Sequence, residues 1–312
     1  MKILITGIAG FIGSNLADKL IEQGHNVIGI DNLSTGKKEN LNFKCTFINE
    51  DLVTIPTDAL DMIMKNVDYV FHVAAKARVQ PSIIDPLGFN DNNVKATLKL
   101  LDSAARAKTV KRFIFSSSSS VYGNGDKLPF EETMTPDPIS PYALQKLIGE
   151  QYCQLYSKIY GLDTVCLRYF SVFGNRQPTS GAYCTILGIF TRQHMAGEAL
   201  TITNDGEQKR DFTHVSDVVN ANILAMKYNK NIPLNGQCFN IGFGKNTSIN
   251  EIASYFGGEK KYIGNVLEPK ETLADNYKAR TILRWKPKVA ISKEYVDGIL
   301  NMEKLKANLN NN

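Results

Sequence analysis

The chain has 312 residues, of which 43% are hydrophobic and 21% are charged, a composition typical of a globular protein with a large core. Its formal net charge of +5 is modest and its arginines do not cluster with aromatic residues, so the charge suits an anionic small ligand better than nucleic acid. The chain starts without a basic leader, and no apolar run approaches the roughly 20 residues that span a bilayer. We therefore expect a cytoplasmic protein that does not bind membranes.

Cysteine and histidine residues follow no pattern that indicates a disulfide or a metal site. The cysteines stand at positions 45, 153, 166, 184 and 238 without a C-x-x-C pair, and the four histidines are dispersed. The composition is consistent with an intracellular enzyme that uses no metal.

Strand and helix signals alternate over the first half of the chain. Short apolar runs predict strands at 1–6, 25–30, 67–73, 111–115 and 164–169, and amphipathic stretches predict helices at 14–23, 91–107 and 142–160. This alternation indicates an α/β fold with a doubly wound parallel sheet, in which helices cover both faces.

The pattern changes beyond Phe173. Helices are predicted at 186–197, 217–226, 248–255 and 277–283, with a turn at 204–206 and a strand at 238–241. We expect residues 1–173 to form one domain and 174–312 mainly a smaller C-terminal α/β substrate lobe, with about 210–242 returning to the first domain. The Asn-rich end, 308–312, is expected to be disordered.

Glycines follow the first predicted strand in the order G-x-x-G-x-x-G, at Gly7, Gly10 and Gly13. A strand, a glycine turn and a helix start let the backbone approach a pyrophosphate. The second predicted strand ends in Asp31, whose carboxylate would accept hydrogen bonds from a ribose 2′-hydroxyl and repel a 2′-phosphate. The first domain is therefore predicted to be a Rossmann domain that binds NAD, while the lysines at 37–38 leave NADP as an alternative.

Tyr142 and Lys146 lie one helical turn apart, so both side chains can point into one pocket. A neighbouring cation favours the phenolate and lowers the tyrosine pKa from about 10. The serine run Ser116–Ser120 follows a predicted strand and could orient a substrate alcohol. The Tyr-x-x-x-Lys spacing is common on helix surfaces, and it predicts acid–base catalysis here because it follows a dinucleotide-binding loop.

Sequence blocks along nearly the whole chain resemble one family. In order they are GIAGFIG from Gly7, DNLSTG from Asp31, FHVAAKARV from Phe71, DNNVKAT from Asp91, FSSSSSVYG from Phe115, SPYALQK from Ser140, RYFSVFG from Arg168, RDFTHVSDV from Arg210 and FNIGFG from Phe239. Together they resemble the extended short-chain dehydrogenase/reductases, specifically the NAD-dependent nucleotide-sugar 4-epimerases that act on UDP-glucose/UDP-galactose or their N-acetyl forms. The resemblance suggests a homodimer joined by the helices at 91–107 and 142–160, with Leu98, Leu101, Ile148, Tyr152 and Leu155 as candidate seam residues.

The resemblance implies roles for individual residues. It makes Tyr142 the catalytic base, Lys146 its activator and a ligand of the nicotinamide ribose, and Ser118 the hydroxyl that holds the sugar O4, with Ser117 and Ser119 as alternatives. Cofactor-binding positions are Gly7, Gly10, Phe11, Ile12, Gly13, Asp31, Asn32, Ser34, Thr35, Gly36, Asp51, Leu52, Ala74, Ala75, Lys76, Asn92, Asn93, Ser116, Tyr142, Lys146 and Tyr169. Substrate-binding positions are Lys76, Ser118, Ser119, Tyr142, Ser171, Thr185, Arg210, Glu268 and Thr272.

Other interpretations remain open for some of these positions. Lys76 could be a solvated surface lysine, and Asn92 and Asn93 could be helix caps. Ser119 and Ser120 stand where the related 4,6-dehydratases carry an Asp-Glu pair that eliminates water. Without that pair, a dehydratase is disfavoured, and the missing glutamate also argues against a UDP-glucuronate decarboxylase.

Departures from the family pattern concern the substrate. Asn265 occupies the place of an arginine that clamps the diphosphate, with Lys270 or Lys261 as candidate substitutes. Ser171 stands where the 4-epimerases commonly carry asparagine. At the position that gates the sugar 2-substituent, Thr272 is small enough to leave room for an N-acetyl group.

The expected reaction removes hydrogen from C4 of a nucleotide sugar and returns it to the other face, through a transient 4-keto sugar and without net oxidation. The alternatives are a UDP-glucuronate epimerase, and a reductase or dehydrogenase acting on a dTDP-, GDP- or CDP-sugar. A non-catalytic NAD-binding scaffold is a further alternative, because fold alone does not determine function.

Overall fold

The computed structural model describes residues 1–125, 127–181, 184–229 and 231–310, and its centre is a seven-stranded parallel sheet. The strand order is β11-β6-β5-β4-β1-β2-β3. The strands are β1 (Lys2–Thr6), β2 (Asn26–Asp31), β3 (Thr46–Asn49), β4 (Tyr69–His72), β5 (Arg112–Ser118), β6 (Thr164–Tyr169) and β11 (Gln237–Ile241). The central strands β1 and β4 to β6 are almost entirely buried, as the apolar runs in the sequence predict.

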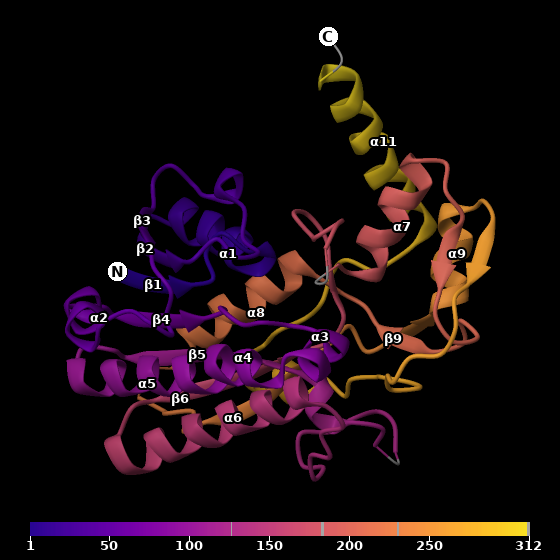
Figure 1. Cartoon of the computed structure of the whole chain (residues 1–312). Coiled ribbons are helices and arrows are strands. Elements are labelled where there is room, and N and C mark those ends of the chain that lie inside the picture. Colours follow the sequence, from indigo (N-terminus) through magenta and orange to yellow (C-terminus); the bar gives the residue numbers. More distant parts are fainter. Residues whose placement is uncertain (126, 182–183, 230, 311–312) are drawn as a thin grey trace.

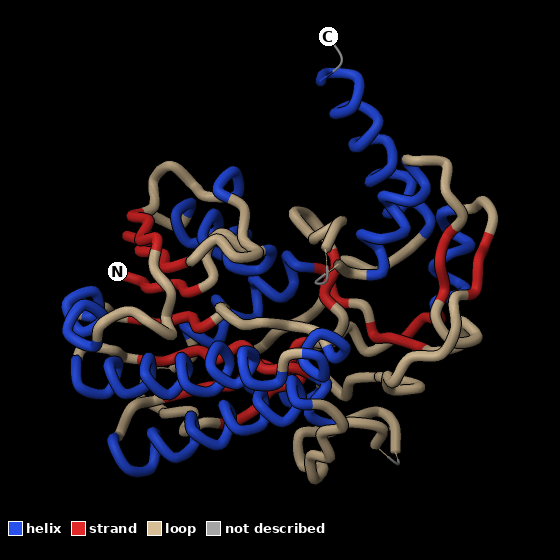
Figure 2. The backbone as a smooth tube through the Cα atoms, viewed as in Figure 1, coloured by secondary structure: helices blue, strands red, loops and turns tan. Residues whose placement is uncertain are grey.

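Helices cover both faces of this sheet (Figures 1 and 2). On one face lie α1 (Phe11–Glu22), α8 (Val215–Lys227) and α10 (Tyr277–Ile282), and on the other α2 (Thr57–Met64), α5 (Ala96–Ala107) and α6 (Pro141–Tyr160). Two separate apolar clusters, one on each face, hold the layers together. The predicted doubly wound α/β fold is confirmed.

Several predicted boundaries differ in the structure. Helix α1 begins at Phe11, earlier than predicted, because the glycine loop itself forms the N-cap. The helix predicted at 91–107 is in part a π-helix, η2 (Asp91–Lys95), which continues into α5. Strand β5 extends through Ser118, so its last residues are serines, and the rest of the run forms the 3₁₀ helix η3 (Ser119–Tyr122).

Short helices connect the layers near the end of β4 and beside β2. These are α3 (Val79–Ile84), α4 (Pro86–Asn90) and the 3₁₀ helix η1 (Lys38–Asn40), none of which the periodicity predicted. Among the described residues, no helix is both long and apolar enough to cross a membrane.

The C-terminal lobe lies beside the carboxyl ends of the sheet (Figure 1). Its elements are β7 (Val172–Phe173), α7 (Ile186–Met195), β8 (Leu200–Ile202), β9 (Lys209–Asp211), β10 (Thr213–His214), β12 (Asn246–Ser248), α9 (Ile249–Phe256), β13 (Lys260–Tyr262) and α11 (Lys293–Asn310). Paired short strands and one apolar cluster, shared by α7, α9 and α11, make up the lobe. Because β11 lies in the main sheet, we retain the predicted division of the chain as a proposal.

The predicted turn at 204–206 is present, but the end of the chain departs from expectation. Helix α11 continues to Asn310, so the expectation of disorder is wrong for 308–310. The Leu, Glu, Lys and Ala residues of this segment have high helix propensity, so the helix extends to Asn310. Residues 311–312 lie outside the described residues.

A buried ion pair joins α6 to the sheet. Arg168 on β6 donates from Nε to Glu150 Oε1 at 2.8 Å and from Nη2 to Oε2 at 2.7 Å. The side chains of Arg168 and Glu150 are only 4% and 2% exposed. Ser117 on β5 donates a further hydrogen bond to Glu150 at 2.5 Å. One carboxylate on α6 therefore binds two neighbouring strands.

We expect Glu150→Ala to lower the free energy of unfolding by about 3–5 kcal/mol, because it leaves the Arg168 charge buried without its partner. Glu198→Ala is the matched control, since Glu198 and Arg192 are 3.3 Å apart but 53% and 47% exposed. The control should change the free energy by no more than about 1 kcal/mol. Urea denaturation checks both variants, and equal effects would contradict a special role for the buried pair.

Candidate active site

The glycine loop after β1 leaves space that a side chain would fill. Gly7 has φ of 72°, and a Cβ there would lie 2.8 Å from Ala74 Cα. A Cβ on Gly13 would lie 2.1 Å from the Gly7 carbonyl oxygen. Gly10 is the N-cap of α1 and offers no side chain to its first N–H groups, which are therefore available to an anion. The loop fits a pyrophosphate held by backbone.

Asp31 is placed where the sequence predicts the cofactor ribose. Its Oδ2 accepts a hydrogen bond from Ala9 N at 3.0 Å and its Oδ1 from Leu33 N at 2.8 Å. Burial raises the pKa of Asp31, while the two backbone hydrogen bonds lower it. Lys37 forms an exposed ion pair with Glu39 at 3.3 Å and does not line the adjoining cavity. The carboxylate, rather than the lysine, faces the cavity and suits NAD.

A cavity of about 990 Å³ connects the glycine loop with the C-terminal lobe. All predicted substrate positions line it, as do most predicted cofactor positions: Gly7, Gly10, Phe11, Ile12, Gly13, Asp31, Asn32, Ser34, Thr35, Asp51, Leu52, Ala74, Ala75, Lys76, Asn92, Tyr142 and Tyr169. The predicted positions that do not line it are Gly36, Asn93, Ser116 and Lys146. The cavity is large enough for a dinucleotide and a second ligand.

Asn93 supports the cavity wall from behind. Its Oδ1 accepts from Lys76 N and its Nδ2 donates to Lys76 O, both at 2.9 Å. The same Nδ2 donates to Gln145 Oε1 on α6. Asn93 is only 2% exposed and lies within η2, so it is neither a helix cap nor a cavity-lining residue. Gly36 likewise packs against Ala9.

Lys76 lies at the rim of the cavity. Its Nζ is 3.1 Å from Asp85 Oδ2, and its side chain is 31% exposed. It is therefore neither a fully solvated surface lysine nor a buried one.

Tyr142 and Ser118 face each other across the end of β5. Burial raises the pKa of the Tyr142 phenol, while a hydrogen bond with Ser118 and the positive charge of Arg78 lower it. The Lys146 Nζ lies 5.9 Å from the centre of the Tyr142 ring and donates to Ser116 O at 2.8 Å. Burial lowers the pKa of Lys146 to about 8, against the opposing charge of Glu150. The expected cluster of serine, tyrosine and lysine is therefore assembled.

The geometry favours Ser118 over its neighbours as the catalytic hydroxyl. Ser117 is engaged with Glu150, and its side chain is only 3% exposed. Ser118 Oγ accepts from Ser120 N at 3.2 Å and lies 2.9 Å from Ser120 Oγ. Ser119 lines the cavity without a hydrogen bond to Tyr142 among the described contacts.

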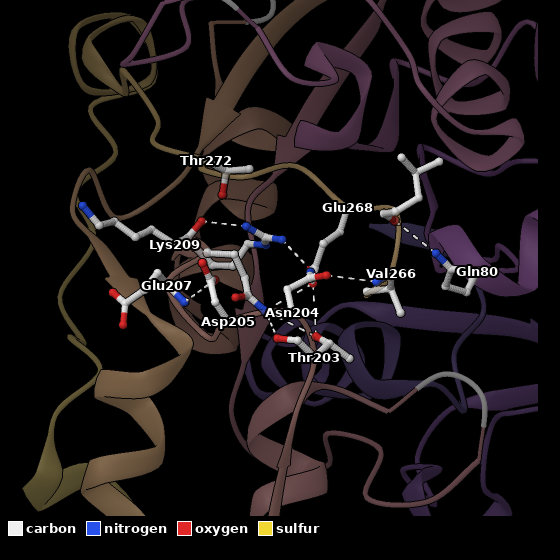
Figure 3. A network of polar contacts seen from close by, with 12 residues as sticks. Gln80, Thr203, Asn204, Asp205, Glu207, Lys209, Val266, Glu268 and Thr272 are labelled. Carbon is white, nitrogen blue, oxygen red and sulfur yellow. Dashed lines mark hydrogen bonds and ion pairs between the residues drawn. The ribbon is translucent and has the colours of Figure 1, made fainter. Parts of the chain in front are cut away.

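At the far end of the cavity, Arg210 forms an ion pair with Glu268, which Figure 3 labels together with Asn204 and Gln80. The distance from Arg210 Nη2 to Glu268 Oε2 is 2.5 Å. Asn204 Nδ2 donates to Glu268 Oε1 at 2.8 Å, and Gln80 Nε2 donates to the carbonyl of Leu267 at 3.0 Å. The segment that carries Glu268 is thus bound both to the lobe and to helix α3.

The remaining predicted substrate positions are polar, and two of them already form hydrogen bonds within the protein. Thr185 caps α7 by accepting from Gly188 N at 3.0 Å. Thr272 is only 5% exposed, and its Oγ1 lies 3.4 Å from Asp211 N. Ser171 lines the cavity beside Arg210. These short side chains leave room for a ligand between β5 and the lobe.

Arg78 is a cavity-lining residue that the sequence analysis did not single out. It lines the cavity in the loop after β4, and its charge acts on the pKa of Tyr142. The available signal was an arginine within the alanine-rich block that follows a predicted strand, two residues beyond Lys76.

A glycine loop on a parallel sheet, an acidic residue ending β2 and a Ser-Tyr-Lys cluster define an extended short-chain dehydrogenase/reductase. The model of the NAD dependent epimerase/dehydratase family matches residues 3–242. The chain belongs to this family, and its cofactor is NAD.

Several named proteins that resemble the chain are sugar-nucleotide epimerases. It is 36% identical to the UDP-glucose 4-epimerase of Mycolicibacterium smegmatis, over 94% of this chain and 95% of the relative. A UDP-glucose 4-epimerase from Thermotoga maritima, solved with UDP-glucose, is 38% identical with a TM-score of 0.90, covering 99% of this chain and 100% of that one. A UDP-N-acetylglucosamine 4-epimerase from Methanobrevibacter ruminantium, solved with UDP-N-acetylmuramic acid, is 38% identical with a TM-score of 0.87, covering 95% of each chain.

Tyr142→Phe should retain the fold and NAD binding but lower turnover by at least about 10²-fold, because it removes a general acid–base group. Tyr160→Phe is the matched control, since Tyr160 lies on the same helix and is 50% exposed. Steady-state turnover and NAD titration of both purified variants check this expectation. Near-normal turnover of the Tyr142 variant would remove Tyr142 from the mechanism.

Proposed function

We propose that the protein catalyses the NAD-dependent 4-epimerisation of a UDP-sugar, through a transient 4-keto intermediate. The observation that carries the proposal is a single cavity that brings together the glycine loop, the Ser118–Tyr142 pair and the Arg210–Glu268 pair. Such a cavity can hold a cofactor, a reacting alcohol and the anionic diphosphate of the substrate side by side.

The residues of the chain account for the proton transfers. Ser118 orients the sugar 4-hydroxyl, and the Tyr142 phenolate removes its proton and later returns it to the 4-keto oxygen. NAD, when bound along the glycine loop, supplies reversible two-electron oxidation of the alcohol carbon. Arg210 holds the diphosphate, so the 4-keto sugar can rotate while the nucleotide stays in place.

Hydroxyl side chains beside Ser118 favour epimerisation over dehydration. Ser119 lines the cavity, and Ser120 is hydrogen-bonded to Ser118. Elimination of water needs a group that titrates near neutral pH, which a serine hydroxyl does not.

The similar enzymes from Mycolicibacterium smegmatis and Thermotoga maritima are named for UDP-glucose, and the one from Methanobrevibacter ruminantium for UDP-N-acetylglucosamine. Thr272, which lines the cavity, is short enough to admit a 2-acetamido group. The proposal therefore includes both UDP-glucose/UDP-galactose and their N-acetyl forms.

The purified protein should interconvert UDP-glucose with UDP-galactose, and UDP-N-acetylglucosamine with UDP-N-acetylgalactosamine, without accumulating reduced cofactor. Chromatography of the epimers, together with the absorbance of reduced cofactor, measures both properties. Accumulation of reduced cofactor would indicate a dehydrogenase instead. Conversion only of UDP-glucuronate, or only of dTDP-, GDP- or CDP-sugars, would contradict the proposed substrate class.

Thr272→Tyr is the matched variant for the sugar pocket in this assay. Its ring should suppress the N-acetyl substrates by about one to two orders of magnitude while sparing UDP-glucose, as expected for an overpacked pocket. Unchanged relative rates would show that residue 272 does not limit the size of the sugar 2-substituent.

We also propose that the protein is a homodimer joined along α5 and α6. Leu155 and Ile159 on α6 are 43% and 60% exposed, and Leu144 on the same helix is 47% exposed. The predicted seam needs correction, because Leu101 is fully buried in the core, and Leu98 and Tyr152 pack against it. The exposed face of α6 supports the dimer.

Light scattering should give twice the chain mass for the wild type and a monomer mass for Leu155→Glu/Ile159→Glu, because buried charges would oppose an apolar interface. Phe43→Glu is the control, since Phe43 is 90% exposed outside these helices. A monomer mass for the concentrated wild type would refute the dimer.

A further inference from the structure

Arg78 is a cationic side chain at the substrate end of the cavity. It also lines a smaller cavity of about 170 Å³ together with Ser171, Thr185 and Arg210. Protein surrounds the guanidinium closely enough for burial to lower its pKa, yet the side chain is exposed because it faces the open cavity. Arg78 is therefore accessible to a ligand from within the cavity.

The backbone at Arg78 adopts a conformation that favours glycine. Its φ is 91° and its ψ is 141°. Residues with side chains rarely occupy this region, and strain of this kind gathers at ligand-binding segments. Glycine would satisfy the backbone more readily, so the presence of arginine indicates a use for its side chain.

Two further cations that line the cavity, Arg210 and Lys76, form ion pairs with acidic residues. Arg210 pairs with Glu268 at 2.5 Å, and Lys76 pairs with Asp85 at 3.1 Å. A nucleoside diphosphate brings at least two negative charges, so it needs more positive charge than Arg210 supplies.

The positions expected to supply that charge do not face the cavity. Asn265, which stands in place of the clamp arginine, is exposed and lines neither cavity. The same holds for Lys261 and Lys270, the candidate substitutes. The lining of the two cavities therefore does not favour these lysines as substitutes.

Arg78 lies between the catalytic phenol and Arg210. Burial raises the pKa of the Tyr142 phenol and of the Cys184 thiol, and the charge of Arg78 opposes this rise in both, while Arg78 shares the smaller cavity with Arg210. In the proposed reaction, C4 of the sugar meets Tyr142, and the diphosphate extends from C1 on the opposite side of the ring. A diphosphate that reaches Arg210 would pass the space that Arg78 borders.

We propose that Arg78 binds the diphosphate of the nucleotide sugar together with Arg210, and replaces the arginine absent at position 265. A guanidinium fork matches two phosphate oxygens at once, which a lysine ammonium does not. The inference rests on the proposed function, because it takes a nucleoside diphosphate as the anionic half of the substrate.

Arg78→Met and Arg78→Gly test this role by isothermal titration with UDP and with uridine. The Kd for UDP should rise roughly tenfold or more in both variants, while uridine binding stays unchanged. Arg78→Gly relieves the backbone conformation, so its thermal midpoint should not fall, which separates loss of binding from loss of folding. Arg280→Met is the control, since Arg280 is exposed and lines neither cavity.

Three results would overturn the inference. An unchanged Kd for UDP in both variants excludes diphosphate binding. A loss confined to UDP-glucuronate, with UDP and UDP-glucose unaffected, assigns Arg78 to a sugar carboxylate. Unchanged binding with a shifted pH profile of turnover assigns it to Tyr142 instead.

The failure of the proposed function is distinguishable from these results. If the wild type binds no UDP, the titrations are repeated with CDP, GDP and dTDP, and binding to none of them refutes both proposals. Binding by the wild type with no effect of Arg78 refutes only the role of Arg78.

Discussion

The direction of the strands decides where the chemistry of this protein lies. Because the strands of the main sheet are parallel, their carboxyl ends meet at one edge. Strands β1 and β4 are neighbours, but the chain continues from β1 to β2 on one side and from β4 to β5 on the other, which opens a crevice between them. The backbone at Gly7 and Ala74 meets across this crevice, and only the absence of a Cβ on Gly7 permits the approach.

Contacts between β5 and α6 then convert this edge into a catalytic arrangement. Ser116 accepts a hydrogen bond from Lys146 through its carbonyl, and Ser117 donates to Glu150. A hydrogen bond with Ser118 opposes the rise in the pKa of Tyr142 that burial causes. Tyr142, Lys146 and Glu150 are spaced one helical turn apart, so they lie on one face of α6 and contact successive residues of β5. The serine run therefore serves both packing and chemistry, and the Glu150 ion pair with β6 completes the attachment.

The central elements could be predicted from the sequence because their apolar patterns are local. The structure confirms the doubly wound sheet and α6, which begins with a proline and ends at a glycine. Strand β3 was missed because it lies at the edge of the sheet and none of its residues is buried, so no apolar run marks it. The π-helix before α5 was missed because its hydrogen-bond register leaves no trace in periodicity.

The sequence by itself determined the glycine loop, the acidic end of β2 and the pairing of Tyr142 with Lys146, because each depends on spacing within one turn or one strand. Tertiary structure alone decided which serine faces Tyr142, that Asn93 supports Lys76 from behind, and that Arg78 borders the cavity whereas Asn265 does not. These outcomes depend on which residues from distant segments meet at the carboxyl edge of the sheet. Sequence spacing does not predict these contacts, because they depend on how the helices and the lobe pack around the strands.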